Sequence, residues 1–322
     1  MSNFELPIIP DYIGANYIGQ EKAKKTINFQ IHSQRQRQLL EPILITSQRG
    51  SGKTAISRLL AKSLLNKDGS PKRAIEINGA NLQKLSSFVS SVIIPHVAND
   101  QEITLVLEEC HICSLEILTW LLSALTTDTT GINRVQYEDS EFVFDFRKFH
   151  FIATTTNPEK LPKAFLSRMA RVELEFYQPN ELVAILHKNT LGIQFVGGVE
   201  EQIISVARKS PRETVKLAKN LIKYCEQKGN YVFSATDWTV FKDIFNIRTL
   251  GLINNELEIL RYLSQNGPQP LRGLAAKLGV DSKTVQQDYE LFLLSEGLIK
   301  VSGQRLLTMA GQRVLDLENG KT

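Results

Sequence analysis

The sequence has no long hydrophobic run and little cysteine. No uninterrupted apolar stretch approaches the ~18 residues that a membrane-spanning helix needs. The first ten residues carry acid rather than a basic patch followed by an apolar segment, as a secretory signal would. Three cysteines cannot form a framework in which every thiol is paired, and they fit a reducing compartment. We therefore expect a cytoplasmic protein that does not enter a membrane.

Charge and composition are not extreme either. The chain is 42% hydrophobic and 22% charged, which is typical of globular proteins and excludes fibrous and disordered classes. The net charge of +4 permits an anionic partner such as DNA without requiring one. A length of 322 residues predicts two or three domains.

The hydrophobic pattern changes twice along the chain. In residues 1–178, short runs rich in Ile, Val and Leu alternate with amphipathic stretches, as in a parallel α/β sheet. Residues 179–248 are predicted to be helical, and residues 249–322 show the helix-turn-helix and two alternating segments of a winged helix. The predicted sheet strands are Ile43–Thr46, Ala74–Ile77, Ile103–Leu107, Phe149–Thr154 and Val172–Phe176.

A β-hairpin is predicted inside the first domain. Between residues 131 and 146 apolar side chains alternate with polar ones, and these apolar residues are Val135, Tyr137, Phe142, Phe144 and Phe146. We expect the hairpin to project from the domain.

The strongest chemical signal is a phosphate-binding loop at residues 47–54. The segment Ser-Gln-Arg-Gly-Ser-Gly-Lys-Thr follows an apolar strand and opens a helix, as a P-loop requires, although Ser47 stands where glycine is usual. Lys53 would bridge the β and γ phosphates of ATP, and the Thr54 hydroxyl would bind Mg²⁺. The predicted nucleotide contacts of this loop are Gly50, Ser51, Gly52, Lys53, Thr54 and Ala55. The alternative is a Gly-Ser-Gly turn that precedes Lys-Thr by chance.

Two carboxylates follow the third predicted strand. Glu108 and Glu109 follow Ile103–Leu107, at the end of the strand where open α/β sheets bind ligands. Glu108 would organise the Mg²⁺ shell and Glu109 would orient and polarise the attacking water. Helix-capping acids are the alternative. Most such strands end in Asp then Glu, so the extra methylene of Glu108 predicts slower hydrolysis rather than weaker binding.

Cysteine and histidine occur together directly after these acids. Cys110-His111-Ile112-Cys113 has the spacing of half a zinc site, but the chain has no second Cys/His pair at matching spacing. Thiols packed beside a nucleotide site are therefore the favoured interpretation.

Several short motifs recur in the order and spacing of one known family. They are Tyr17-Ile18-Gly19-Gln20, Glu108-Glu109-Cys110-His111, Ala153-Thr154-Thr155-Thr156, Leu166-Ser167-Arg168-Met169, Leu174-Glu175-Phe176-Tyr177 and Ser210-Pro211-Arg212. Together they resemble RuvB, the bacterial Holliday-junction motor, over nearly the entire chain. The resemblance implies an AAA+ P-loop NTPase domain with a parallel sheet, a helical lid domain and a C-terminal winged-helix domain.

The resemblance also implies roles for individual residues. Tyr17 and Ile18 would lie against the adenine, and Thr155 would sense the γ-phosphate. Arg168 matches the arginine finger that reaches the nucleotide of a neighbouring subunit, and Arg212 matches the second sensor in the lid. A ring follows by analogy, most simply a hexamer, because the finger completes the site only when a neighbour is docked. Surface or lid salt bridges are the alternative for both arginines.

The wing of the winged helix offers groups suited to phosphate contacts. These are Lys300, Ser302, Gln304 and Arg305, which would bind duplex or branched DNA without reading bases. The alternative is that this module packs only against protein.

Some positions depart from the family. Ile9 and Thr156 stand where the family has arginine, and residues 131–141 replace a Gly-Pro-rich segment of the hairpin that receives RuvA in the family. A RuvA-like partner at the 131–146 hairpin is expected by analogy, but the altered segment makes dependence on a standard RuvA doubtful.

Two functions of different classes remain open. One is a ring-forming ATPase that translocates duplex DNA and drives Holliday-junction branch migration or related remodelling. The other is a nucleotide-dependent DNA-binding switch or loader with little hydrolysis, which Ser47 and Glu108 favour. A transcription regulator ranks lower, because Thr284, Gln286 and Gln287 form a weak base-reading surface.

Overall fold

The computed structural model describes residues 9–37, 39–98, 101–126 and 130–320. It divides into two compact units, which are treated separately below. The first is Met1–Ala184 with Ser210–Arg212, and the second is Ile185–Lys209 with Glu213–Thr322. Within the described ranges no helix has the length and apolar character needed to cross a membrane.

A parallel five-stranded sheet forms the centre of the first unit. The strands lie in the order β2-β3-β6-β1-β7. Their bounds are β1 (Ile43–Thr46), β2 (Arg73–Asn78), β3 (Ile103–Glu108), β6 (Phe149–Thr155) and β7 (Ala170–Glu173). The predicted parallel sheet is confirmed, and only the last strand differs in position.

The last strand begins two residues and ends three residues earlier than predicted. It pairs residue by residue with the short β1, from Ile43 opposite Ala170 to Thr46 opposite Glu173. The amide of Leu174 donates the final bond to the carbonyl of Thr46, so pairing ends with β1. Phe176, which was predicted to belong to the strand, is 57% exposed. The length of the partner strand, which hydropathy does not encode, sets this boundary.

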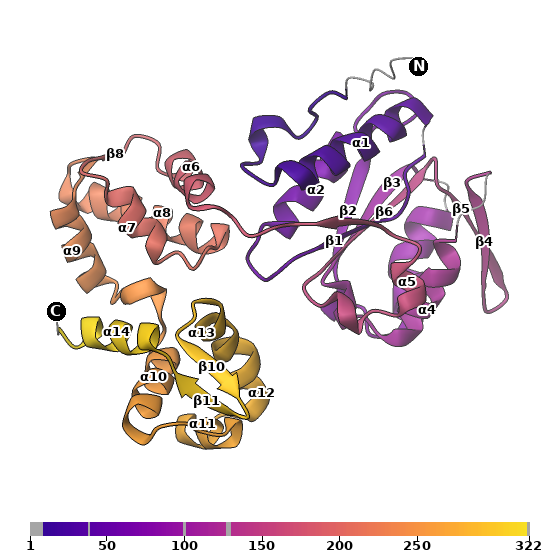
Figure 1. Ribbon diagram of the computed structural model, residues 1–322. Coiled ribbons are helices and arrows are strands. Elements are labelled where there is room, and N and C mark those ends of the chain that lie inside the picture. Colours follow the sequence, from indigo (N-terminus) through magenta and orange to yellow (C-terminus); the bar gives the residue numbers. More distant parts are fainter. Residues whose placement is uncertain (1–8, 38, 99–100, 127–129, 321–322) are drawn as a thin grey trace, which may run out of the picture. The chain divides into compact units, whose positions relative to one another are not determined.

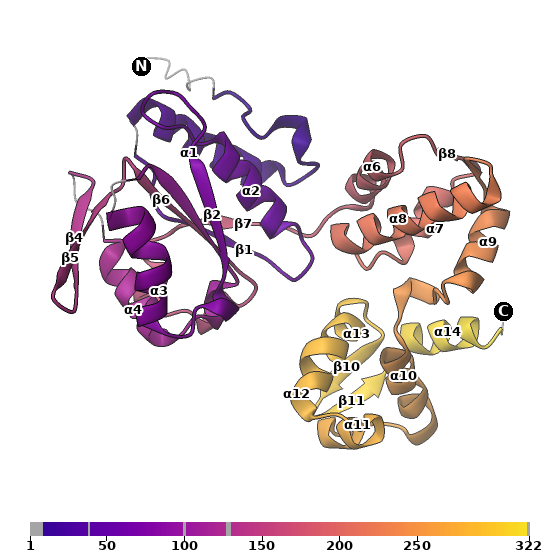
Figure 2. The same cartoon turned by 180° about the vertical axis from the view of Figure 1, so that it is seen from behind.

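Helices cover both faces of this sheet. In Figures 1 and 2, α1 (Glu21–Arg37) and α2 (Lys53–Ser63) lie on one face, while α3 (Leu85–Phe88), α4 (Leu115–Ala124) and α5 (Lys163–Leu166) lie on the other. Alternate residues of the buried strands, Leu105 and Phe151 among them, join α4 residues such as Ile117 and Leu121 in one core cluster. The β1–α2 loop is thereby held at the carboxyl edge of the sheet.

The predicted hairpin is present and has a buried apolar face. It consists of β4 (Ile132–Tyr137) and β5 (Ser140–Asp145), and Figure 1 shows it beyond the sheet beside α4. The ring of Trp120 on α4 makes edge contacts with Phe142 at 6.4 Å and with Phe144 at 5.8 Å between ring centroids. The hairpin therefore projects, as expected, but its apolar side chains belong to the core.

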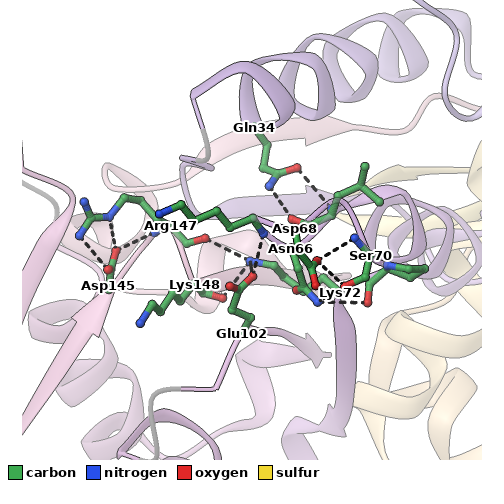
Figure 3. Close-up of polar contacts among 12 residues, drawn as sticks. Gln34, Asn66, Asp68, Ser70, Lys72, Glu102, Asp145, Arg147 and Lys148 are labelled. Atoms are coloured by element: carbon green, nitrogen blue, oxygen red, sulfur yellow. Dashed lines mark hydrogen bonds and ion pairs between the residues drawn. The ribbon is translucent and has the colours of Figure 1, made fainter.

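A buried lysine ties the hairpin to the amino end of the sheet (Figure 3). The Nζ of Lys72, just before β2, donates to the carbonyls of Arg147 at 3.2 Å and Lys148 at 3.0 Å, where the chain returns from β5 to β6. Glu102 lies 4.0 Å away, and the Lys72 side chain has no exposed surface. Burial lowers the pKa of Lys72 to about 8.

The second unit is helical and ends in a winged helix. Its helices and strands are α6 (Pro179–Asn189, shared with the first unit), β8 (Gln194–Phe195), α7 (Val199–Ser205), α8 (Pro211–Lys228, whose first residues belong to the first unit), β9 (Val232–Phe233), α9 (Ala235–Ile244), α10 (Asn254–Asn266), α11 (Leu271–Leu278), α12 (Ser282–Thr284), a π-helical turn (Val285–Glu290), α13 (Leu291–Ser295), β10 (Ile299–Ser302), β11 (Gln304–Leu307) and α14 (Met309–Glu318). The Asp281 side chain caps α12, because it accepts from the Thr284 amide at 2.9 Å. The predicted wing is confirmed as the antiparallel pair β10–β11.

An ion pair joins the helical part of the second unit to the winged helix. The guanidinium of Arg208 bonds both carboxylate oxygens of Glu256 at 2.7 and 2.8 Å, and it lies 3.5 Å over the ring of Phe292. Glu256 on α10 has no exposed surface. Because a buried carboxylate needs such a partner, Arg208 contributes to holding the two parts together.

Candidate functional site

Two glycines allow the loop after β1 to curl tightly. Gly50 and Gly52 have φ of 85° and 93°, values that residues with a side chain rarely adopt. A Cβ on Gly52 would collide with the hydroxyl of Tyr17, and one on Gly50 would lie 2.8 Å from the hydroxyl oxygen of Ser210. Both glycines of the predicted P-loop are therefore required by conformation and by space.

Lys53 is buried at the mouth of this loop. Its side chain is 6% exposed, and Nζ donates to the carbonyls of Ser47 at 3.2 Å and Gln48 at 3.0 Å. Burial lowers the pKa of Lys53, an effect that the charge of Glu109 opposes and that of Arg212 reinforces. The ammonium is thus held where an anionic ligand could replace the carbonyls.

Serine at the position that is usually glycine fits the loop. The hydroxyl of Ser47 shares a hydrogen bond with the hydroxyl of Ser51, so the side chain closes across the turn rather than blocking it. Thr54 is half-buried in the first turn of α2, and Ala55 beside it is exposed. Helix α2 presents its amino end, with the positive end of its dipole, to this loop.

The two acids of β3 reach the same edge of the sheet. Glu109 has φ of 49°, and its Oε1 lies 3.9 Å from the Nζ of Lys53. The Oε1 of Glu108 is buried without a hydrogen-bond partner; the nearest cation is Nη2 of Arg58 at 3.9 Å, too long for a hydrogen bond. A buried carboxylate oxygen left this way suits a hard cation such as Mg²⁺, which needs few protein ligands.

The carboxylate of Glu109 is fixed by the end of β6. Its Oε2 accepts bonds from the amide of Thr156 at 3.2 Å and from the Thr156 hydroxyl at 3.0 Å. The Nδ1 of His111 lies 3.4 Å from the same oxygen and shares a 2.9 Å hydrogen bond with the Thr155 hydroxyl. Burial lowers the pKa of His111, so the ring is neutral near pH 7.

Thr156 and His111 were not predicted as site residues. Thr156 was singled out only as a departure from the family, and His111 only as a member of a motif and of a half zinc site that was not favoured. The available signal was positional: each stands one or two residues beyond a predicted site residue at the carboxyl end of a strand.

Tyr17 braces the loop from the side. Its hydroxyl donates to the carbonyls of Ser51 at 3.3 Å and Gly52 at 3.2 Å, and the side chain is 6% exposed. Burial raises the pKa of Tyr17, so the hydroxyl keeps its proton. Ile18 is half-buried. The structure thus brings Tyr17 to the phosphate loop, and its contact with adenine stays a prediction.

The two predicted arginines occupy different surroundings. Arg168 is exposed; its Nε donates to the Thr126 hydroxyl at 2.9 Å and its Nη1 to the carbonyl of Ala164 at 3.0 Å. Across the described ranges no carboxylate forms an ion pair with Arg168, so its charge is available to an outside anion. Arg212 is also exposed, and it lies close enough to Lys53 to lower the pKa of that lysine.

The polar residues of the wing differ in exposure and pairing. Lys300, Ser302 and Gln304 are exposed, as a phosphate contact requires. Arg305 instead forms an ion pair with Glu290, at 3.0 Å from Nε and 3.1 Å from Nη2, and its side chain is only 11% exposed. This placement makes Arg305 a poorer candidate for DNA contact than the other three.

The thiols beside the site are buried. Burial raises the pKa of Cys110 and raises that of Cys113 to about 11, so both stay protonated. Over the part of the chain that the structure describes, no cluster of three or more His, Cys, Asp or Glu side chains could hold a metal ion. The favoured interpretation of packed thiols agrees with this burial.

Two family models match the chain. Residues 43–179 match "ATPase family associated with various cellular activities (AAA)", and residues 249–316 match "RuvB C-terminal winged helix domain". These are the segments that contain the loop, the two acids and the wing.

Curated relatives and solved structures agree with these matches. The Holliday junction branch migration complex subunit RuvB of Picosynechococcus sp. is 27% identical over 305 residues, covering 91% of this chain and 80% of the relative. The same subunit of Rubrobacter xylanophilus is 24% identical over 292 residues, covering 88% and 79%. The Thermotoga maritima RuvB Holliday junction branch migration motor has the same fold, with a TM-score of 0.76 at 22% identity over 96% of this chain and 98% of that one. With the loop, the paired acids and the winged helix, these likenesses identify the chain as an AAA+ ATPase of the RuvB family.

Proposed function

We propose that this protein is an ATP-driven DNA motor of the RuvB type, which translocates duplex DNA and drives branch migration of Holliday junctions. The observation that carries the proposal is the convergence of Lys53 and Glu109 at one sheet edge, in a chain that also ends in a winged helix. The curated relatives are named as branch migration subunits, which supports the same function here.

Each site residue has a distinct task in hydrolysis. Lys53 exchanges its loop carbonyls for the β and γ phosphates, which also receive the amides of residues 50–55. Glu109 accepts a hydrogen bond from the attacking water, whose oxygen bonds to the γ-phosphorus as the bond to ADP breaks. Thr54 and Glu108 would hold Mg²⁺, which neutralises charge on the phosphates. Thr155 and Arg212 would respond to the γ-phosphate.

Activity is proposed to require a ring of subunits. Among the residues that the structure describes, Arg168 bonds a hydroxyl and a carbonyl and no carboxylate, so its charge can stabilise the γ-phosphate of a neighbour without first breaking an ion pair with them. A head-to-tail ring has one such site at every interface, and a hexamer is proposed by analogy with the RuvB family. Hydrolysis would then depend on assembly.

DNA is proposed to contact the wing through its exposed polar groups. Lys300, Ser302 and Gln304 can bind phosphates, while Arg305 shapes the wing through Glu290. A RuvA-like partner is proposed for the hairpin. The outward side of the hairpin carries the ion pair of Arg134 with Glu141 at 2.7 Å and the exposed Val143, so that partner would have to offer complementary charge beside an apolar group.

A synthetic Holliday junction with homologous arms tests the motor directly. With ATP and Mg²⁺ the wild-type protein should move the branch point and hydrolyse ATP faster than without DNA, if necessary after addition of a RuvA protein. Glu109→Gln, which keeps the shape but not the charge, should bind ATP and the junction without moving it. If the rate of ATP hydrolysis were the same with and without DNA, and the branch point did not move, the proposed motor function would be refuted.

The alternative switch makes a different prediction in the same assay. It is favoured by Glu108, whose longer side chain changes the metal-side position. A switch would bind DNA only with ATP, release it with ADP, and behave alike in the wild type and in Glu109→Gln over many minutes.

A further inference from the structure

We infer that Thr156 is a positioning residue for hydrolysis, which holds the Oε2 of Glu109 so that Oε1 faces the attacking water. The inference rests on the ATPase activity and deepens the function proposed above. It assigns a task to a position where the sequence departs from its family.

Glu109 is attached to β6 at two points. Its backbone amide donates to the Thr154 hydroxyl at 3.3 Å, and its carboxylate receives the amide and the hydroxyl of Thr156. Between these two points the residue has φ of 49°, a conformation that residues other than glycine seldom adopt. The contacts from β6 therefore fix both the backbone and the side chain of the catalytic acid.

The bonds from Thr156 go to one oxygen only. The amide at 3.2 Å and the hydroxyl at 3.0 Å both reach Oε2, and the His111 ring lies on the same oxygen at 3.4 Å. Oε1 lies 3.9 Å from the Nζ of Lys53, the group that marks the phosphates. A carboxylate with one oxygen satisfied by the protein presents the other to a water on the phosphate side.

The hydroxyl contributes more to this arrangement than the amide does. The hydrogen bond from the hydroxyl is shorter, at 3.0 Å against 3.2 Å for the one from the amide, and it can be removed by substitution without altering the backbone after β6. Loss of the hydroxyl leaves the carboxylate free to rotate, and misplacement of a catalytic group lowers turnover more than it lowers binding.

Steady-state kinetics of Thr156→Val and Thr156→Ser test the inference. Valine has the shape of threonine without the hydroxyl, and its kcat should fall ~10-fold while KM for ATP stays within about twofold. Serine retains the hydroxyl and should restore most of the turnover. Thr156→Ala serves as a second hydroxyl-free variant if valine prevents folding. Thr239→Val, an exposed helix position in the second unit, is the matched control and should match the wild type.

The outcomes separate a positioning role from a structural one. Equal turnover of the hydroxyl-free variants and the wild type would overturn the inference, as would a loss that serine fails to restore or that appears in KM alone. If the wild type hydrolyses ATP but leaves junctions immobile, the proposed motor fails, while the ratio between the valine and serine variants still decides the role of Thr156.

Discussion

Two buried lysines lie at opposite ends of the same sheet. Lys53 follows β1 at the carboxyl edge and Lys72 precedes β2 at the amino edge; burial lowers the pKa of both. Each donates to two backbone carbonyls and has a glutamate about 4 Å away, Glu109 at 3.9 Å and Glu102 at 4.0 Å. Burial, bonding and charge pairing therefore do not distinguish a catalytic lysine from a structural one.

The difference lies in the segments to which the accepting carbonyls belong. Lys53 binds a glycine-rich loop whose backbone has positive φ at Gly50 and Gly52, and this loop ends in the first turn of a helix. Lys72 binds the chain between β5 and β6, where the carbonyl of Lys148 also accepts from the amide of Ile103 at the start of β3 and so belongs to the sheet. A lysine is catalytic when its bonds can be exchanged for those of a ligand, and structural when they close a fold.

The largest expected effect follows replacement of Lys53. Lys53→Ala should lose measurable turnover, because the phosphates lose their only buried cation in the loop. Its free energy of unfolding should stay within about 1 kcal/mol of the wild type, since the ammonium is held by two loop carbonyls and by Glu109 at 3.9 Å, which keeps its bonds from Thr156. Phosphate release and thermal unfolding measure the two quantities. A strongly destabilised Lys53→Ala protein would mean that Lys53, like Lys72, stabilises the fold.

Arg168 extends the comparison to a cation that is proposed to act on the nucleotide of another subunit. Arg168→Ala should lower turnover about 10³-fold and leave ATP affinity nearly unchanged. Mixing it with Lys53→Ala should restore part of the activity, because mixed rings contain interfaces that have both an intact loop and an intact finger. No recovery at any mixing ratio would mean that Arg168 does not act across an interface.

Lys72 should affect stability and its pH dependence instead of turnover. Its pKa is about 8 in the folded chain against 10.5 as the ordinary value, so between these pH values the unfolded chain binds more protons. The free energy of unfolding should therefore rise with pH in this window, by ~1.4 kcal/mol per unit and about 3 kcal/mol in total. Lys72→Met should lack this rise and keep turnover within about twofold. Urea unfolding at pH 7.5, 9 and 10.5 measures it, and equal slopes in both proteins would contradict the assignment.

Of the two buried lysines, only Lys53 could be recognised as a site residue from the sequence. The P-loop is a local pattern of eight residues, 47–54, and its strand and helix flank it directly, so its chemistry was predictable. Lys72 contacts residues 75 and 76 positions away in the chain, and no local pattern encodes such a distance. The contact from Thr156 to Glu109 spans 47 positions and was not predicted for the same reason.

The fold was predictable for a similar reason, with one boundary wrong. Four sheet strands follow from short apolar runs, and the hairpin and the wing follow from alternating apolar residues, patterns that each segment carries in itself. Strand β7 ends at Glu173 because β1 ends at Thr46, a property of the pairing rather than of either segment. The ion pair of Arg305 with Glu290 likewise depends on the packed wing, so the sequence could not separate Arg305 from Lys300.

Those two basic residues of the wing give the smallest expected effect. Lys300→Ala should weaken duplex DNA binding and reduce the slope of log affinity against log salt by about 1, because one phosphate contact is lost. Arg305→Ala should leave that slope unchanged and destabilise the wing by about 3 kcal/mol, because Glu290 remains buried and unpaired. Fluorescence anisotropy at several salt concentrations and thermal unfolding measure the two effects. If Arg305→Ala reduced the salt slope and Lys300→Ala did not, the exposure of a side chain would not predict which cations bind DNA. The distinction between exchangeable and structural bonds would then apply only to the lysines of the sheet.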